Sequence, residues 1–496
     1  MNKKAMNNKL QKRASVKANY IYNLMYDILA LIVPLITTPY ISRVLTPESI
    51  GIYSYTYSII MYFTAFVVLG TKSFAIKRIA RAQNKEEASI VFWNVFILRV
   101  LSGISALAVY YAYVFLKAEN KTIAIIQSFY IIAVIFDISW FFQGVENFKT
   151  IIFRNLIVKI ISLAVIFTFV KDNGDLLIYV FSLSGLTLLG NLTLWGYLPK
   201  YLTKVKVSVL WPFEGIKEIM ILFVPTLALQ IYSAIDKTML GAITSQMAEN
   251  GYYEQSGKII SAALTAITSL SIVGLPRISA LFAEKEYRKV SECMQSSYRF
   301  VFFLSLPMML GICAVSDILV PWFLGSSYSS CIMLLCVLSA LFVIIGLSNI
   351  TGFQYLVATD RQSVYSFSIV VGTAANILLN WLLISKLLSL GAAIASVISE
   401  AIVLIIQLSY IIIIKKEFSF REFFGKSYRY LIGSILMFIC IHCLKQYLPV
   451  GFAGICISVV IGIIIYIISL IIMKDDMVID FIKQQILDRF FKHKKP

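Results

Sequence analysis

Charge is scarce in this chain. Only 14% of its 496 residues are Asp, Glu, Lys or Arg, against about 25% in a typical soluble domain. Histidine occurs twice, at His442 and His493, and no Ser-His-Asp or metal-binding constellation surrounds either one. We therefore expect no metal and no bound cofactor.

A nucleotide-binding loop is also missing. The nearest match is Phe424-Gly-Lys-Ser427, but Phe420 stands where the phosphate-binding motif needs its first glycine. We therefore do not expect an ATP-driven pump on this chain alone. Of the seven cysteines, all but Cys293 lie in apolar runs, which predicts buried free thiols and not a disulfide framework.

Long apolar runs are what the chain has in abundance. Hydrophobic residues make up 59% of it, and the mean hydropathy is +0.83. A membrane-spanning helix needs about 20 mainly apolar residues. The sequence thus predicts an all-α polytopic membrane protein with fourteen transmembrane helices, at about 18–42, 49–70, 90–115, 123–143, 151–170, 175–197, 218–241, 257–277, 299–320, 331–356, 363–385, 391–414, 430–447 and 452–473.

The two halves of the chain echo each other weakly but in order. Val33-Pro34 and Val224-Pro225 each open an apolar run, and Gly51-Ile-Tyr53 and Gly251-Tyr-Tyr253 each follow one. Such internal repeats are typical of transporters. We predict two six-helix bundles and two additional helices. The expected segments are a cytoplasmic N-terminus at 1–17, bundles at 18–210 and 211–414, the added pair at 415–473 and an amphipathic basic tail at 474–496.

Basic residues fall in alternate loops. With the N-terminus inside, 34 of the 44 Lys and Arg residues lie in inside segments, and about a fifth as many lie outside. This distribution predicts that both termini are cytoplasmic. The net charge of +18 is then a signal of topology and of contact with anionic membrane lipids, with no nucleic-acid partner. The longest outside loop is expected at 242–256.

Four charged residues fall inside predicted helices of the first half. Asp27, Arg99, Asp137 and Lys159 all lie about 10–14 Å from the cytoplasmic edge, by the rise of a helix. We expect them to meet in the bundle. They form either an ion-pair cluster that fixes packing or a wet cavity in which Arg99 and Lys159 bind an anionic headgroup.

The second half carries Asp236 and Lys237 near the outer end of one run and Glu400 inside another. An intramembrane carboxylate is a candidate carrier of a proton or cation. A salt bridge between Glu400 and Lys237 is the competing interpretation. Trp140 belongs either to an interfacial aromatic belt or to a platform that stacks on sugars.

Four motifs follow one another along nearly the whole chain. They are Pro34–Leu45 with Gly51-Ile-Tyr53, Asp137–Glu146, Asp236-Lys237 with Gly251–Ile259, and Gly391–Glu400 preceded by Asn376 and Asn380. In this order they resemble the polysaccharide flippase family (Wzx-type translocases of O-antigen and capsule repeat units) of the multidrug/oligosaccharidyl-lipid/polysaccharide exporter superfamily.

The resemblance implies movement of a polyprenyl-diphosphate-linked oligosaccharide from the inner to the outer leaflet of a bacterial plasma membrane. Transport would use alternating access and a proton or sodium gradient, and polysaccharide polymerase machinery is an implied partner. The implied substrate-binding residues are Arg43, Arg99, Trp140, Gln143, Lys159, Lys237, Asn376 and Asn380, and the implied ion-coupling residues are Asp27, Asp137, Asp236 and Glu400.

Three alternatives remain open at this point. An exporter of cationic drugs in the same superfamily would need a net negative cavity, whereas the membrane charges here tip basic once Arg43 and Arg277 are counted. A flippase of the peptidoglycan precursor fits the motifs less well. A membrane-embedded polysaccharide polymerase would need larger loops that carry catalytic residues.

Overall fold

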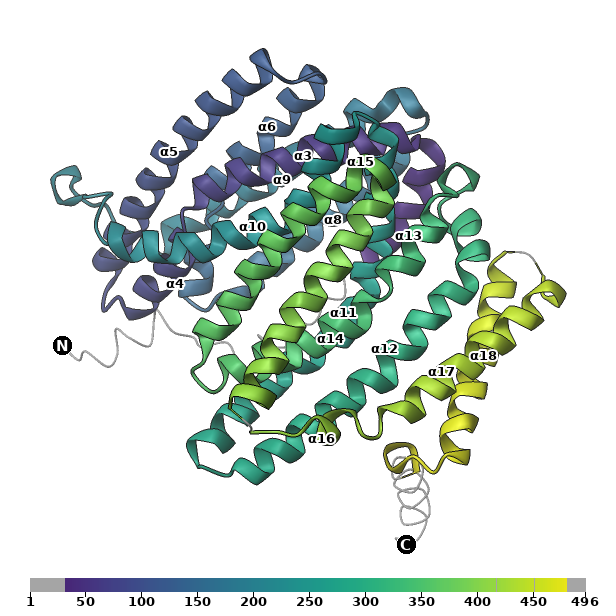
Figure 1. The fold of residues 1–496 in the computed structure, drawn as a ribbon. Helices are drawn as coiled ribbons and strands as arrows, with labels where there is room; N and C mark the ends of the chain where they lie inside the picture. The colour runs from purple at the N-terminus through teal and green to yellow at the C-terminus, as the bar shows by residue number, and fades with distance from the viewer. Residues whose placement is uncertain (1–31, 416, 450, 480–496) are drawn as a thin grey trace, which may run out of the picture. The chain divides into compact units, whose positions relative to one another are not determined.

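The computed structural model describes residues 32–415, 417–449 and 451–479. These residues form helices and no strand (Figure 1). They divide into two compact units, Met1–Gly251 and Tyr252–Pro496. The predicted bundle boundary between residues 210 and 211 differs from this division and stays a prediction about the membrane bundles.

The first unit opens with a helical stretch at residues 32–44. Thr46 then caps the next helix, since its hydroxyl accepts a hydrogen bond from the Ser49 amide at 3.3 Å and Pro47 occupies the first helical position. The other helices of this unit follow in chain order. They are α3 (Pro47–Val68), α4 (Thr71–Arg81), α5 (Lys85–Leu116), α6 (Lys121–Ile135), α7 (Ser139–Gly144), α8 (Phe148–Phe169), α9 (Leu176–Thr193) and α10 (Ile216–Thr244).

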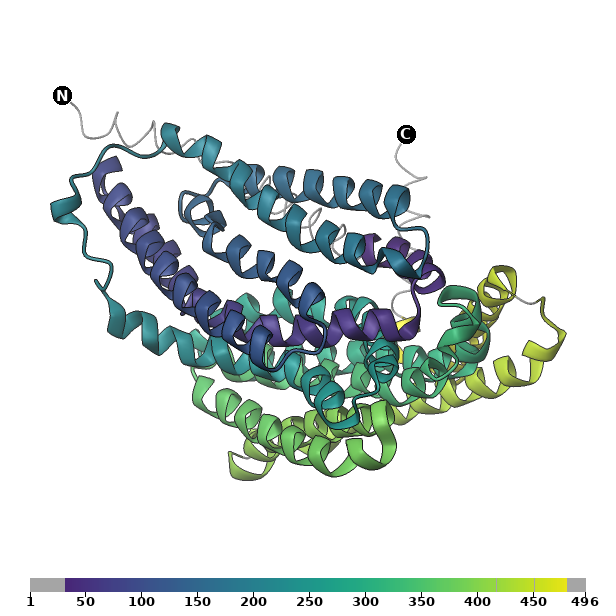
Figure 2. The same cartoon turned by 90° about the horizontal axis from the view of Figure 1, so that it is seen from above.

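The second unit holds most of α11, which begins at Met247. Its remaining helices are α12 (Tyr287–Phe323), α13 (Cys331–Leu338), α14 (Leu341–Ser348), the π-helix η5 (Asn349–Val357), α15 (Gln362–Ser409), the π-helix η6 (Tyr410–Ile414), α16 (Phe420–Phe424), α17 (Ser427–Leu444) and α18 (Phe452–Ile472). The added pair α17 and α18 lie side by side in both views, drawn in yellow (Figures 1 and 2). Tyr466 of α18 donates to the Phe303 carbonyl of α12 at 2.9 Å, which ties the pair to this unit.

Eleven helices in the described part of the chain are long and apolar enough to cross a membrane. Their outward side chains are large and apolar, for example Ile104 and Val109 on α5 and Ile463 on α18, all more than half exposed. Lipid tails can cover such a surface, as expected for a multi-pass membrane protein. The all-helical membrane fold is confirmed, and the count of fourteen spans stays a prediction.

One helix conceals two of the predicted spans. The backbone of α15 is non-helical at Leu388, where φ is 54° and ψ is −133°. The segments before and after this break pack against each other. Their closeness is seen at Gly372, where an added methyl group would lie 3.3 Å from the Ser399 carbonyl oxygen. The break falls between the predicted runs 363–385 and 391–414.

The loop predicted at 242–256 is wrong. α10 continues to Thr244, Ser245 ends it in a left-handed conformation, and α11 begins at Met247. The polar residues that suggested a loop lie in the first turns of a helix. The first turns of α11 pack closely on α3, at Gly51 and Gly251. This packing favours a helix where the local sequence favours a loop. The expected segment 1–17 and most of the expected tail lie outside the described residues.

Candidate functional site

Arg99 lies at the centre of the polar contacts that join α4, α5 and α7. Its side chain is 2% exposed. The Nε group donates to the Thr71 hydroxyl and Nη1 donates to the Asp137 carbonyl oxygen, both at 2.8 Å. The guanidinium carbon also lies 5.6 Å from the centre of the Trp140 ring. A buried cation needs such partners, because burial without them is costly.

Asp137 lies in the short non-helical connection between α6 and α7. Its carboxylate accepts hydrogen bonds from the Ser139 amide at 2.9 Å and the Ser139 hydroxyl at 3.1 Å. The carboxylate thus accepts a hydrogen bond from the first backbone amide of α7, which has no partner within the helix. The main-chain oxygen of the same residue accepts the hydrogen bond from Arg99. Of the four charges expected in one layer, the structure brings Arg99 and Asp137 together.

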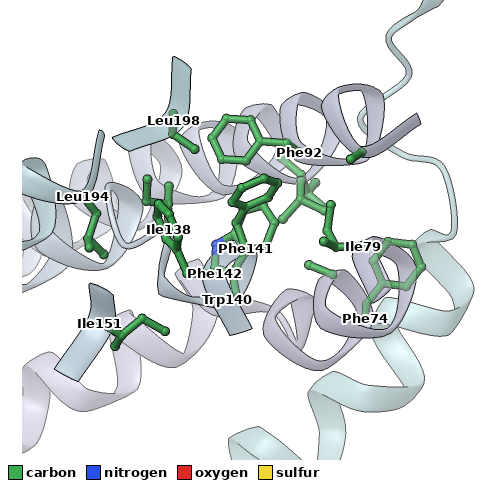
Figure 3. Packing of buried hydrophobic residues seen from close by; sticks show 14 of the residues in the cluster. Phe74, Ile79, Phe92, Ile138, Trp140, Phe141, Phe142, Ile151, Leu194 and Leu198 are labelled. Carbon is green, nitrogen blue, oxygen red and sulfur yellow. The ribbon is translucent and has the colours of Figure 1, made fainter. Parts of the chain in front are cut away.

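Trp140 is fully buried in the aromatic core of the first unit (Figure 3). Its ring stacks on Phe92, with centroids 5.5 Å apart, and Phe141 meets the same phenyl ring edge-on. Both Trp140 and the neighbouring Phe141 come from α7, a helix of six residues that carries its aromatic side chains inward. In this conformation the ring contributes to packing. Gln143, on the same helix, is half-buried.

The other predicted cations of the first unit are more accessible than Arg99. Arg43 is exposed in the helical stretch 32–44, and Lys159 is half-buried on α8. The predicted membrane charge Asp27 lies outside the described residues. A headgroup approaching from lipid or water would reach Arg43 and Lys159 more readily than Arg99.

Asp236 and Lys237 are half-buried in the C-terminal third of α10. The next residue, Thr238, fixes this helix against α3. Its hydroxyl lies 2.8 Å from the Ser58 hydroxyl and 3.0 Å from the Tyr62 hydroxyl. The charged pair is therefore held on a helix whose position is set by neutral hydrogen bonds.

The predicted polar residues of the second unit share α15. Asn380 and Asn376 are buried, and Asn380 Nδ2 donates to Asn376 Oδ1 at 3.1 Å. Glu400 is half-buried on the limb beyond the Leu388 break. On that second limb, Ser396 lies 3.0 Å from the Tyr253 hydroxyl, which joins α15 to α11.

Sequence reasoning missed a bidentate ion pair in the second unit. Arg361 donates through Nη1 and Nη2 to the two Glu417 carboxylate oxygens at 2.5 Å each, and the Tyr355 hydroxyl donates to the same carboxylate at 2.8 Å. Burial alone raises the pKa of Glu417, but the hydrogen bonds from Arg361 and Tyr355 outweigh it, so the pKa lies below its usual value. The two charges are 56 residues apart, and no sequence pattern marked them as neighbours.

The sequence analysis also did not foresee a charged groove, which has a volume of about 590 Å³ and runs along α4 and the start of α10. Its cations pair with carboxylates, Lys77 with Glu218 at 3.0 Å and Arg78 with Glu214 at 3.9 Å. The charged residues that line it are Lys77, Arg78, Arg81, Glu87, Glu214 and Glu218. The predicted inside segment 71–89 contains these cations, but only the fold places the acidic start of α10 beside them.

Among the described residues, no group of three or more His, Cys, Asp and Glu side chains is placed to hold a metal ion. The polar side chains described above are cations, carboxylates, neutral amides and hydroxyls, most of them on helices. This set can bind anions, form internal ion pairs and exchange protons or small cations.

Comparisons with known proteins identify the family of this chain and its relatives. The family described as "Polysaccharide biosynthesis protein" matches residues 16–282. An Escherichia coli (strain K12) protein named as an O-antigen transporter is 25% identical over 409 residues, covering 80% of this chain and 97% of the relative.

Solved structures share the fold. The lipid II flippase MurJ, in an inward closed conformation, superposes with a TM-score of 0.70 at 15% identity, covering 93% of this chain and 99% of that structure. An inward-facing multidrug resistance transporter of the MATE family gives a TM-score of 0.60 at 15% identity, covering 76% and 92%. At these identities the likeness shows the architecture alone.

Proposed function

The chain belongs to the polysaccharide biosynthesis protein family, and we propose from this that it is a membrane flippase for lipid-linked oligosaccharides. Family membership is the observation that carries the proposal. The match runs through α3 to α10 and ends one residue before α11 does. The relative named as an O-antigen transporter supports the same function, since the match covers 97% of that relative. The protein is a transporter and not an enzyme.

The substrate we propose is a polyprenyl-diphosphate-linked repeat unit of a surface polysaccharide. Its diphosphate carries negative charge and calls for Arg or Lys partners. Arg43, Lys159 and Lys237 are the predicted cations with accessible surface. Arg99 donates two hydrogen bonds, to Thr71 and to Asp137, so in this conformation it joins neighbouring helices.

Entry of the headgroup is proposed at the charged groove of α4. This groove holds a cluster of three cations, Lys77, Arg78 and Arg81, whose charge three carboxylates of the same groove balance. A diphosphate would compete with Glu218 for Lys77 and with Glu214 for Arg78. The abundance of basic residues in segment 71–89 supports placing this end on the cytoplasmic side of a bacterial plasma membrane, with both termini inside.

Energy would come from a proton or sodium gradient, with Asp236 and Glu400 as the coupling carboxylates and Asp27 and Asp137 as further candidates. Asp236 and Glu400 lie within long apolar helices, where a carboxylate is costly and usually functional. Alternating access would expose the substrate to one side and then the other. Polysaccharide polymerase machinery is the proposed partner after translocation.

A leaflet assay tests the proposal. Purified protein is placed in liposomes that contain a fluorescent polyprenyl-diphosphate sugar, and its arrival in the opposite leaflet is followed with and without a pH or sodium gradient. We expect gradient-dependent movement. No movement under any gradient, together with export of a cationic dye, would favour the drug-exporter function that the MATE-like fold also permits.

A further inference from the structure

A cavity of about 190 Å³ lies between the middle of α3 and the C-terminal ends of α5 and α10 in the first unit. Tyr55 contributes to it from α3 and Tyr113 from α5, while Glu119 and Asn120 come from the connection between α5 and α6. That connection falls in a segment that the distribution of basic residues predicts to be outside. The cavity therefore lies at the ends of α5 and α10 opposite the charged groove of α4, on the predicted exit side.

Two tyrosines form its aromatic wall. Tyr55 and Tyr113 both line the cavity, and both are half-buried. Gly241 of α10 packs directly on the Tyr55 ring, where any methyl group would overlap it. The glycine allows this close approach and holds the ring in place. A fixed ring with a polar hydroxyl offers an apolar face and a hydrogen-bonding edge in one side chain.

The rim is polar but carries no excess of positive charge. Lys117 and Glu119 are both exposed and both line the cavity, so their charges balance. Asn120 precedes α6, yet its side chain makes no capping hydrogen bond and its amide stays available to a ligand. A diphosphate needs a cluster of cations, which this cavity lacks. A neutral polyhydroxylated ligand fits this mixture of donors, acceptors and aromatic faces.

The size agrees with that chemistry. A volume of 190 Å³ corresponds to about six water molecules in the liquid, which is the scale of one sugar ring. We infer that the cavity between α3, α5 and α10 binds a single sugar residue of the oligosaccharide, against Tyr55 and Tyr113, with Glu119 and Asn120 bonding its hydroxyls. This inference rests on the proposed function, and it assigns recognition of the sugar and of the diphosphate to different places in the first unit.

Direct binding is tested on the full-length protein in lipid nanodiscs. Saturation-transfer difference NMR is recorded with methyl glucoside, methyl rhamnoside and methyl N-acetylglucosaminide as probes. At least one glycoside should show a signal that falls about fivefold or more in Tyr113→Phe and in Glu119→Gln, as expected for losing one hydrogen bond. Tyr111→Phe is the matched control, because Tyr111 bonds Ser128 at 2.9 Å outside the cavity.

The same variants are then compared in the leaflet assay. A rise of about fivefold in the half-saturating concentration of the lipid-linked sugar for Tyr113→Phe and Glu119→Gln, and none for Tyr111→Phe, supports the cavity as a sugar site. Wild-type movement with unchanged variants and no glycoside signal overturns the cavity and leaves the flippase standing. Glycoside binding without any wild-type movement keeps the cavity as a sugar site but overturns the proposed function and its link to the lipid-linked substrate.

Discussion

Gly51 and Gly251 face each other where α3 meets the first turn of α11. A methyl group added at Gly51 would lie 3.0 Å from the Gly251 amide nitrogen and would overlap the Met247 carbonyl. One added at Gly251 would overlap the Pro47 carbonyl. Two backbones can approach this closely only without side chains between them. The two glycines are also the matching positions of the sequence repeat, in Gly51-Ile-Tyr53 and Gly251-Tyr-Tyr253.

The first prediction concerns this crossing. Gly51→Ala and Gly251→Ala should each destabilise the fold by about 1–3 kcal/mol, since the obstructing atoms are backbone and cannot rotate away. Thermal unfolding in detergent measures the effect. Gly257→Ala on the same helix is the control, because nothing lies within 4 Å of its added methyl group. Equal unfolding temperatures for all three variants would contradict the close crossing.

Arg99 gives a second prediction. Arg99→Ala removes two hydrogen bonds and buried volume, so we expect a loss of about 2–4 kcal/mol in unfolding free energy. Arg99→Lys should recover only part of it, because an ammonium cannot reproduce the planar geometry. Lys159→Ala, at a half-buried position on α8, should lower transport with little effect on stability. A fully stable Arg99→Ala protein that has lost only transport would instead assign Arg99 to the substrate.

The ion pair of Arg361 and Glu417 predicts a pH dependence. The pKa of Glu417 is depressed in the folded protein, so its stabilising effect is complete above the unfolded pKa of about 4.3 and is lost as the pH falls through the lower, folded value. Unfolding temperatures of wild type and Glu417→Gln, measured from pH 7 to pH 3, should differ at neutral pH and approach each other as the pH falls below the unfolded pKa of about 4.3. A constant difference across that range would show that the charge plays no part.

The proposed coupling residues give a further prediction. Asp236→Asn and Glu400→Gln keep the side-chain shape but remove the charge, so each should lower gradient-driven movement in the leaflet assay by about tenfold or more, while downhill exchange is less affected. The readout is the ratio of the two rates in each variant. Asp360→Asn, at an exposed turn before α15, serves as the control. A driven rate that is unchanged in both variants would remove these carboxylates from the coupling step.

Much of the fold followed from hydropathy. An apolar run of about 20 residues has one stable form in lipid, because only a helix satisfies its backbone there. For this reason the predicted runs 90–115 and 151–170 match α5 (Lys85–Leu116) and α8 (Phe148–Phe169) closely. The loop at 242–256 failed because polar residues are a poor guide where close contact between helices decides the structure.

The same distinction between local sequence and helix packing applies to the candidate site. The sequence by itself determined that most of these charges lie in apolar helices and that Asp137 and Trp140 belong to one motif, since both are local properties. It did not predict that Asp137 lies in the non-helical connection between α6 and α7. Only the tertiary structure decided what these residues touch. It directs Arg99 to the main-chain oxygen of Asp137 and buries Trp140 against Phe92. It also brings Tyr55 and Tyr113 to the wall of one cavity, because contacts between helices depend on the packing of the whole bundle, which no local pattern encodes.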